Sequence, residues 1–403
     1  MKIFADLHIH SKYSRATSKN LSIEQLEKYA RIKGINLLGT GDFQHPKYRQ
    51  EIEENLSEDG KGILWTKNKF PFILSTEISL MYSQDGRRAV HLVVLSPNKR
   101  IADKIIAYLG SKGRLDYDGR PIFGIAANDF VKDLKAIDDR IEIIPAHCMT
   151  PWFGLFGSDS GFDSLKDCFK DEIKNIYAIE SGMSADPGML WRLGEKINIV
   201  SFSDLHSFWP WRLGREATIF EIPELSYDNI IKAIRTGEGL AGTIETPPEY
   251  GKYHFDGHRN CNFSCSPKET IKLKGICPVC KRPLTIGVEY RIEKLAKHEE
   301  GFKPANAKKY FKLVPLHELI ALARSTSVSS KKCWEIYNKL IAEFENELNI
   351  LLNAEKEKLA RVADDNLVKL ILENREGKIN VKPGYDGVYG ETFLKEKQAT
   401  LSI

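Results

Sequence analysis

Short apolar segments alternate with amphipathic segments through the first 240 residues of the chain. The apolar segments read KIFADL, INLLGTG, PFILSTEI, AVHLVVLS, IEIIPAH, IYAIES and INIVSFSD, and ATIFEI is a candidate eighth. The segment at 22–34 begins at Ser22, a favourable helix cap, and ends at Gly34, a favourable helix stop. Strands that alternate with helices predict a parallel sheet, and seven or eight such units predict a closed α/β barrel. We expect this barrel to occupy residues 1–245.

Histidine and carboxylate side chains lie at or near the ends of these predicted strands. His8 and His10 come first, in the sequence HIH, and side chains two residues apart in an extended chain point to the same side. Later strands carry the further candidates Asp42, His45, Glu77, His91, His147, Glu180, Asp204 and His206. Barrel enzymes keep their chemistry at the carboxyl ends of the strands, and imidazole with carboxylate suits zinc, manganese or iron. The pattern predicts a polynuclear metal site, although any single histidine has the alternative role of a buried hydrogen-bonding residue.

Four of the seven cysteines lie close together in the middle of the chain. They are Cys261, Cys265, Cys277 and Cys280. Two close pairs of thiolates match a tetrahedral structural zinc site, whereas a redox role for the second pair leaves the first pair unexplained. His254 and His258 are near enough in sequence to replace one ligand. We therefore expect one structural zinc in a small module at 246–312.

Positive charge is concentrated in the same module. The whole chain carries a net charge of +4, but residues 250–312 hold 14 Lys and Arg against 6 Asp and Glu. A local surplus of this kind indicates a polyanionic partner. The residues that we expect to contact DNA phosphates are Lys272, Lys274, Lys281 and Arg282. The alternative for these side chains is an ordinary solvated surface.

The last part of the chain has helical periodicity, which includes KKCWEIYNKLIAEFENELNILLN at 331–353. A glycine-rich segment at 374–391 interrupts it and is similar to a segment near the carboxyl ends of certain DNA helicases. We expect residues 313–403 to form a helical region with a flexible tail. In that tail, Gln398 and Leu401 match the spacing of a sliding-clamp docking motif, but the aromatic pair of the motif is absent.

The sequence shows no sign of a membrane partner. No segment has the length and apolar character of a membrane span, and the first residues lack the pattern of a secretory signal. We therefore expect a cytoplasmic protein.

The sequences HIH at 8–10 and DLH at 204–206 together resemble the signature of the polymerase and histidinol phosphatase (PHP) superfamily. The resemblance covers about the first 240 residues. It implies a distorted seven-stranded β/α barrel that hydrolyses phosphate esters with two or three divalent metals, here zinc, manganese or magnesium. The ligands that it implies for the catalytic metal are His8, His10, Glu77 and Asp204. The resemblance also implies a second ion, which Glu77, His91 and His147 hold, and a third ion, which His206 helps to hold.

Two parts of the sequence depart from the superfamily pattern. Many relatives read Thr-Asp-His after the second strand, whereas this chain reads TGDFQH, which leaves open whether Asp42 or His45 binds metal. No acidic residue occurs in SKYSRATSKN, the segment after HIH, so the third metal lacks one usual ligand. Glu180 is a candidate ligand, and its alternative role is a hydrogen bond that orients a histidine ligand.

The complete layout resembles a family of DNA repair endonucleases within this superfamily. It implies hydrolysis of the phosphodiester on the 5′ side of deaminated bases (uracil, hypoxanthine and xanthine) and of abasic sites, by metal-activated water. Damaged DNA is then the partner. Six aromatic residues have two alternative roles, which are stacking on a displaced base and packing within loops. They are Trp152, Phe153, Phe156, Phe208, Trp209 and Trp211. The rival functions are a small-molecule phosphoesterase, for which the basic module has no evident use, and a non-catalytic DNA-binding factor, which the intact ligand set disfavours.

Overall fold

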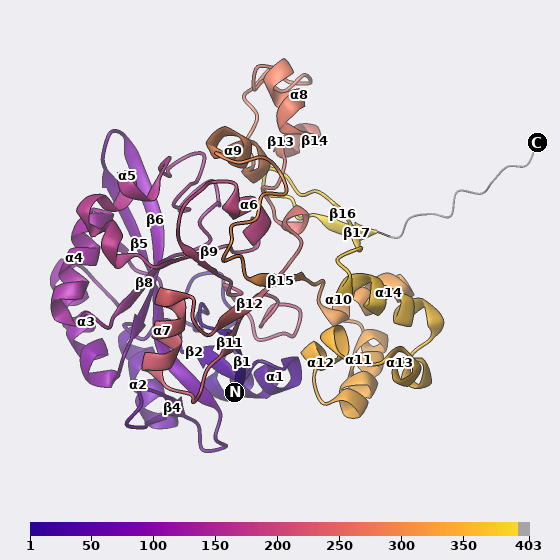
Figure 1. Cartoon of the computed structure of the whole chain (residues 1–403), viewed down its shortest axis with the longest axis horizontal. Helices are drawn as coiled ribbons and strands as arrows, with labels where there is room; N and C mark the ends of the chain where they lie inside the picture. Colours follow the sequence, from indigo (N-terminus) through magenta and orange to yellow (C-terminus); the bar gives the residue numbers. More distant parts are fainter. Residues whose placement is uncertain (394–403) are drawn as a thin grey trace, which may run out of the picture.

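The computed structural model describes residues 1–393, so Gln398 and Leu401 lie outside the described residues. Its centre is a mixed α/β body built on an eleven-stranded sheet (Figure 1). The strands of this sheet are β1 (Lys2–Asp6), β2 (Leu37–Gly39), β3 (Ser57–Glu58), β4 (Leu64–Trp65), β5 (Pro71–Ser83), β6 (Arg87–Ser96), β7 (Ile122–Phe123), β8 (Glu142–Pro145), β11 (Ala217–Glu221), β12 (Leu240–Glu245) and β15 (Lys309–Lys312). The main path is β15-β12-β11-β1-β2-β5-β4-β3, with β6 and β7 paired to β5 and β8 paired to β6.

The sheet is mixed rather than parallel throughout. β1, β2 and β5 are parallel neighbours, as the alternating pattern predicts. β6, however, is antiparallel to β5, and β8 is antiparallel to β6. Only three residues separate β5 from β6, and a parallel partner needs a crossover of about a dozen residues or more. The prediction of a parallel sheet is therefore wrong for this part of the chain.

β9 (Ala178–Glu180) and β10 (Asn198–Val200) form a separate parallel pair. The chain after β10 then returns to the end of β1, where Leu205 forms a parallel bridge with Ile9. The backbone amide of His10 donates to the carbonyl of Leu205 at 3.2 Å. These contacts place the HIH and DLH sequences side by side, although about 200 residues separate them in the chain.

Helices cover the outside of this body (Figure 1). They are α1 (Ile23–Lys33), α2 (Pro46–Asn55), α3 (Lys99–Lys112), α4 (Ala127–Ile137), α5 (Leu165–Phe169), α6 (Pro187–Trp191) and α7 (Tyr227–Thr236), with a 3-10 turn at Lys170–Asn175. α1 has the predicted caps, because the Ser22 hydroxyl accepts from the Gln25 amide and Gly34 has a left-handed φ of 97°. Its buried residues Leu26 and Ala30 pack into the main core.

The middle segment projects from the α/β body at the top of Figure 1. Its elements are β13 (Asp256–His258), β14 (Phe263–Cys265), α8 (Pro267–Lys272) and α9 (Val288–Leu295), with 3-10 turns at Pro248–Tyr250 and Arg259–Cys261. β13 and β14 form an antiparallel hairpin. The strand that ends this segment, β15, pairs in parallel with β12 and so belongs to the main sheet.

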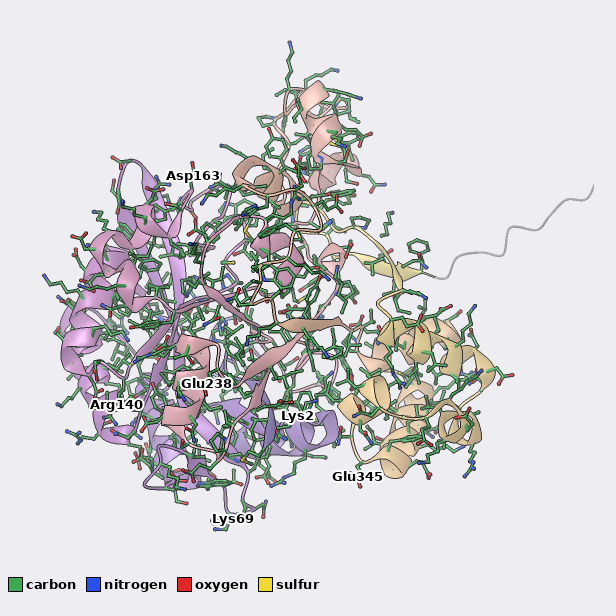
Figure 2. The ribbon with its side chains drawn as sticks, viewed as in Figure 1. Lys2, Lys69, Arg140, Asp163, Glu238 and Glu345 are labelled. Atoms are coloured by element: carbon green, nitrogen blue, oxygen red, sulfur yellow. The ribbon has the colours of Figure 1, made fainter. Side chains whose placement is uncertain are left out.

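A group of helices lies beside the α/β body, at the lower right of Figure 1. It contains α10 (Leu316–Arg324), α11 (Lys331–Phe344), α12 (Glu347–Leu352), α13 (Lys356–Val362) and α14 (Asp365–Arg375). The glycine-rich segment after α14 carries the hairpin of β16 (Asn380–Lys382) and β17 (Glu391–Phe393) and returns to the middle segment, where Tyr385 forms a bridge with Phe255. Side chains occupy the space between the helices and the body, while the labelled Lys69, Arg140 and Glu345 lie at the periphery (Figure 2). Within residues 1–393 no helix is both long and apolar enough to cross a membrane.

Candidate metal centre

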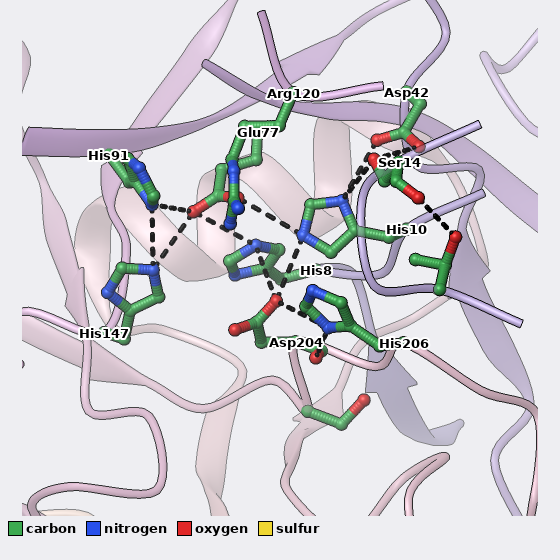
Figure 3. A network of polar contacts seen from close by, with 12 residues as sticks. His8, His10, Ser14, Asp42, Glu77, His91, Arg120, His147, Asp204 and His206 are labelled. Carbon is green, nitrogen blue, oxygen red and sulfur yellow. Dashed lines mark hydrogen bonds and ion pairs between the residues drawn. The ribbon is translucent and has the colours of Figure 1, made fainter. Parts of the chain in front are cut away.

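Two groups of metal-ligating side chains meet in the α/β body and share one residue (Figure 3). The first group is His8, His10, Glu77 and Asp204. The second group is Glu77, His91 and His147. Within each group the ligand atoms all lie within 4.8 Å of one another. Glu77 belongs to both groups, comes from the middle of β5 and is fully buried.

His8 and His10 are each held by a carboxylate on one ring nitrogen. His8 Nδ1 lies 2.9 Å from Glu180 Oε1, and His10 Nδ1 lies 3.1 Å from Asp42 Oδ1. In the neutral form of each ring the hydrogen is then on Nδ1, because an ionised carboxylate only accepts, and the lone pair of Nε2 faces the centre. Both Nε2 atoms and Asp204 Oδ1 are buried and face one another, with His10 Nε2 3.0 Å from Asp204 Oδ1, and none of the three makes a well-aligned hydrogen bond within the described part of the chain. Acceptor atoms that converge in this way fit a divalent cation.

The protonation of these rings responds to the surrounding carboxylates. Burial disfavours the charged form of His8, but Glu180 and Glu77 outweigh it and hold the pKa of His8 well above its ordinary value. A cation bound at Nε2 takes the place of that proton, since metal binding requires a neutral imidazole. Burial lowers the pKa of His91 to about 4, against the opposing effect of Glu77. His91 is therefore a neutral ring, ready to act as a ligand, at neutral pH.

The Glu77 carboxylate lies between the two groups with one oxygen towards each. Its Oε1 is 2.7 Å from His91 Nδ1 and 3.0 Å from His147 Nε2. Its Oε2 is 3.2 Å from His10 Nε2 and accepts a hydrogen bond from Arg120 Nη1 at 3.1 Å. Burial raises the pKa of this carboxyl, but His91, Arg120 and His8 together hold it well below its usual range. An ionised carboxylate in this position could supply one ligand atom to a metal ion in each of the two groups.

The backbone is sharply bent where several of these side chains leave their strands. Asp42, His147 and Asp204 have φ values of 39°, 29° and 47°, in the left-handed region that non-glycine residues seldom adopt. Such conformations cost about 1–3 kcal/mol each and concentrate at functional sites. The fold therefore holds these three side chains in place at a cost to its own stability.

The candidates after the second strand lie outside both groups. Asp42 binds His10 and also accepts hydrogen bonds from the hydroxyls of Ser11 and Ser14, at 2.6 and 2.8 Å. His45 precedes α2, and its ring stacks on Tyr13 at 4.5 Å between centroids. In this structure Asp42 thus orients a ligand, and His45 packs away from the centre.

Glu180 and His206 are also placed next to the ligands rather than among them. Glu180 contacts His8 Nδ1 through both oxygens and accepts the backbone amide of His147 at 2.6 Å. This is the orienting role that the sequence left open for it. The His206 ring lies 4.7 Å from that of His10, and its Nδ1 is 2.9 Å from the backbone oxygen of Asp204.

A cavity of about 450 Å³ opens beside the two groups and is lined by His91, His147 and Asp204. Three arginines, Arg15, Arg120 and Arg215, also line it. Two guanidinium nitrogens of Arg215 are buried without a partner among the described residues. These arginines could not be predicted from the sequence, because arginine in loops is common and no spacing rule connects them to the histidines. Unpaired guanidinium beside a metal-ligand set suits a phosphate.

The six aromatic candidates divide into three environments. Trp152, 39% exposed, and Phe153 both line the cavity, and the Phe153 ring lies 4.4 Å from His91. Phe156 and Phe208 are buried in the core, so neither ring presents a face to a base in this structure. Trp209 and Trp211 stack on each other at 5.4 Å. Both of these rings also pack against Trp334 of α11, so they join the α/β body to the helices.

A separate group of ligand-type side chains lies in the middle segment. It consists of His258, Cys261, Cys277 and Cys280. His258 Nδ1 is 3.1 Å from Cys261 Sγ and 3.3 Å from Cys280 Sγ. Cys265, predicted as a ligand, is outside the group, and its Sγ lies 3.2 Å from Thr270 Oγ1. Three thiolates and an imidazole are a standard zinc donor set, so these residues fit the metal.

The spacing of these four residues contains the signal for His258. Two residues separate His258 from Cys261, and two separate Cys277 from Cys280. The two pairs therefore have the same spacing. The pair that the cysteines alone suggested, Cys261 and Cys265, has three intervening residues. The four basic candidates, Lys272, Lys274, Lys281 and Arg282, are all exposed around this group.

Comparisons with known proteins give four similarities. Residues 315–378 match the family model described as the MJ0043 C-terminal domain. The uncharacterized protein MJ0043 of Methanocaldococcus jannaschii is 31% identical over 300 residues, which cover 71% of this chain; the chain spans 35% of the length of that relative. The crystal structure of the lesion-specific endonuclease PfuEndoQ from Pyrococcus furiosus has a TM-score of 0.88 at 30% identity, covering 98% of this chain and 96% of that one. A complex of endonuclease Q with a 27-mer duplex substrate, which has an abasic lesion at the active site, has a TM-score of 0.87 at 30% identity, covering 98% and 97%.

Proposed function

The chain belongs to the endonuclease Q family, and from that membership we propose that it is a DNA repair endonuclease. We further propose that it hydrolyses the phosphodiester on the 5′ side of uracil, hypoxanthine, xanthine and abasic sites. The products are a 3′-hydroxyl and a 5′-phosphate.

The main support for this proposal is the position of the Glu77 carboxylate, which lies between two sets of ligand atoms and belongs to both. His8, His10 and Asp204 stand on one side of it, and His91 and His147 on the other. The donor types fit zinc or manganese, and the buried Nε2 atoms of His8 and His10 converge with Glu77 and Asp204 on the place that such an ion would occupy. Divalent ions bound there would activate water and stabilise negative charge on a phosphoryl group.

The residues of the chain itself position these ligands and the substrate. Glu180 and Asp42 fix the rings of His8 and His10, as an orienting carboxylate does in many metal enzymes. Arg120 and Arg215 line the cavity and would contact phosphate oxygens of the strand to be cut. Both arginines would thereby hold the scissile phosphate next to the ligand set.

The cavity also fits a displaced nucleotide. Removing a base from the duplex costs a few kcal/mol, and the cost is least at damaged or mismatched pairs. Trp152 and Phe153 line the cavity and could stack on such a base. The exposed Lys272, Lys274, Lys281 and Arg282 on the middle segment would contact the phosphate backbone.

The test is a comparison of substrates. Purified protein with Mn²⁺, Zn²⁺ or Mg²⁺ is incubated with four labelled duplexes that carry uracil, hypoxanthine, an abasic site or no lesion, and with a chromogenic phosphomonoester. We expect nicking on the 5′ side of each lesion and no cleavage of the undamaged duplex. Hydrolysis of the monoester alone would show a small-molecule phosphoesterase, and binding without cleavage would show a DNA-binding factor.

A further inference from the structure

A second cavity, of about 540 Å³, is lined by residues of β10 and β12, among them Asn198 and Thr243. β10 pairs only with β9, whereas β12 belongs to the main sheet, so the cavity occupies the gap between two separate sheets. The segment between α9 and β15, which crosses in front of β9 and β12 in Figure 1, contributes Phe302 and Lys308 to its wall. None of the residues that line it also lines the cavity at the metal centre.

The wall of this second cavity carries unbalanced positive charge. Lys196, Lys308 and Lys309 line it, and none of them forms an ion pair in residues 1–393, although Lys308 Nζ donates to the carbonyl of Gly237 at 2.8 Å. Among the described residues, the only carboxylate in the wall belongs to Glu195, which pairs with Lys297 at 3.2 Å. A site of this composition repels a metal cation and attracts an anion.

The remaining wall is partly aromatic. Trp191 and Phe302 are half-buried and expose ring surface to the cavity. The Thr243 hydroxyl is buried among them, with its residue 3% exposed, and has no hydrogen-bond partner within the described residues. An unpaired buried hydroxyl is a cost that a bound polar group would remove.

We propose that this cavity binds a nucleoside monophosphate, either free or as one unit of a DNA strand. The exposed Lys196 and Lys309 suit the phosphate, the aromatic rings suit a base, and the Thr243 hydroxyl suits a polar edge of the base or sugar. The volume lies within the range of about 300–1,000 Å³ that is usual for ligand sites. Phe302 stacks on His298 at 3.8 Å, and Trp191 packs edge-on against Tyr310 at 5.7 Å. Inorganic phosphate would leave the remaining exposed surface of these two rings uncovered, and a nucleoside would leave Lys196 and Lys309 without a counter-charge. The inference depends on this cavity and not on the chemistry of the metal centre.

The test uses isothermal titration of the metal-free full chain with AMP, adenosine and inorganic phosphate. We expect AMP to bind with one site per chain and at least about tenfold more tightly than adenosine or phosphate. The double variant Lys196→Glu/Lys309→Glu should bind AMP about tenfold more weakly, because both lysines contact the phosphate. Both residues are exposed, so the fold should persist by circular dichroism. Lys67→Glu/Lys104→Glu, an equal charge change at exposed lysines elsewhere, should bind AMP as the parent does.

Two further measurements separate the alternatives. Asp204→Asn should keep its AMP affinity, and loss of binding in this variant would place the nucleotide at the metal centre and overturn the proposal. Failure of the parent to bind AMP at millimolar concentration, or equal binding by both double variants, would also overturn it. A trinucleotide that binds more tightly than AMP and is sensitive to Lys196→Glu/Lys309→Glu identifies a DNA strand as the source. A trinucleotide that binds no better than AMP identifies the free nucleotide.

Discussion

Lys33 of α1 and Glu347 of α12 form a fully buried ion pair, with Nζ 2.6 Å from Oε1. The pair joins the α/β body to the helical region. Lys33 also donates to the carbonyl of Pro210 at 2.9 Å, in the loop that follows DLH. Glu347 accepts from the Tyr337 hydroxyl at 2.9 Å and from the Leu316 amide at 3.0 Å. One buried network thus connects α1, the loop after Asp204 and three helices of the C-terminal region.

Lys33→Met should destabilise the protein by about 3–5 kcal/mol, because it leaves the Glu347 carboxylate buried without its counter-charge. Urea unfolding gives the free energy change. Adding Glu347→Gln to Lys33→Met removes the uncompensated charge and should recover part of the loss. If the free energy of unfolding of Lys33→Met alone lies within about 0.5 kcal/mol of that of the parent, water replaces the lysine at this junction.

His258→Ala and Cys277→Ser should each lower bound zinc by about one atom per chain, because both remove a ligand of the middle segment. Cys265→Ser is the matched control and should keep the full zinc content. Elemental analysis of the purified variants measures this. If Cys265→Ser loses zinc and His258→Ala retains it, the four cysteines are the ligands instead.

Glu180→Gln should weaken metal binding or activity by about 10–100-fold without unfolding the protein, because an amide holds His8 Nδ1 less strongly than a carboxylate. Asp42→Asn should have a similar effect through His10. Metal titration of both variants tests the orienting role, and the matched control is Glu221→Gln, an exposed carboxylate at the end of β11. Unchanged metal affinity in both would mean that the histidines need no such support.

The residues of the two candidate metal-binding groups could be predicted from sequence because strand ends are visible as breaks in apolar runs, as at HIH and DLH. The role of Glu180 could not be decided, since an orienting carboxylate and a ligand have the same residue type. The pairing of β6 was predicted wrongly, because an apolar strand reads the same in either direction and only the three-residue turn before it excludes a parallel partner. The two alternatives for Trp211, base stacking or packing, could not be separated for a different reason. Its partner Trp334 is more than 100 residues away, and no local pattern indicates that contact.

Charge reversal of Lys272, Lys274 and Arg282 to Glu should weaken binding to damaged and undamaged duplex alike. These side chains are exposed and would contact phosphates, which carry no sequence information. The slope of log affinity against log salt should fall in magnitude by about 0.9 for each DNA phosphate that the variant no longer neutralises. Fluorescence anisotropy at several salt concentrations gives both quantities. Weaker binding to damaged DNA alone would assign these residues to lesion recognition instead.

The most direct test of the metal-centre account is single-turnover cleavage of a duplex with one abasic site, compared between the parent, His8→Ala and Asp204→Asn. The parent with a divalent metal should nick the damaged strand on the 5′ side of the lesion. Both variants should bind the duplex and leave it intact, because each removes one of the four ligand atoms that converge at the first group. Cleavage by folded Asp204→Asn at the rate of the parent would contradict the account.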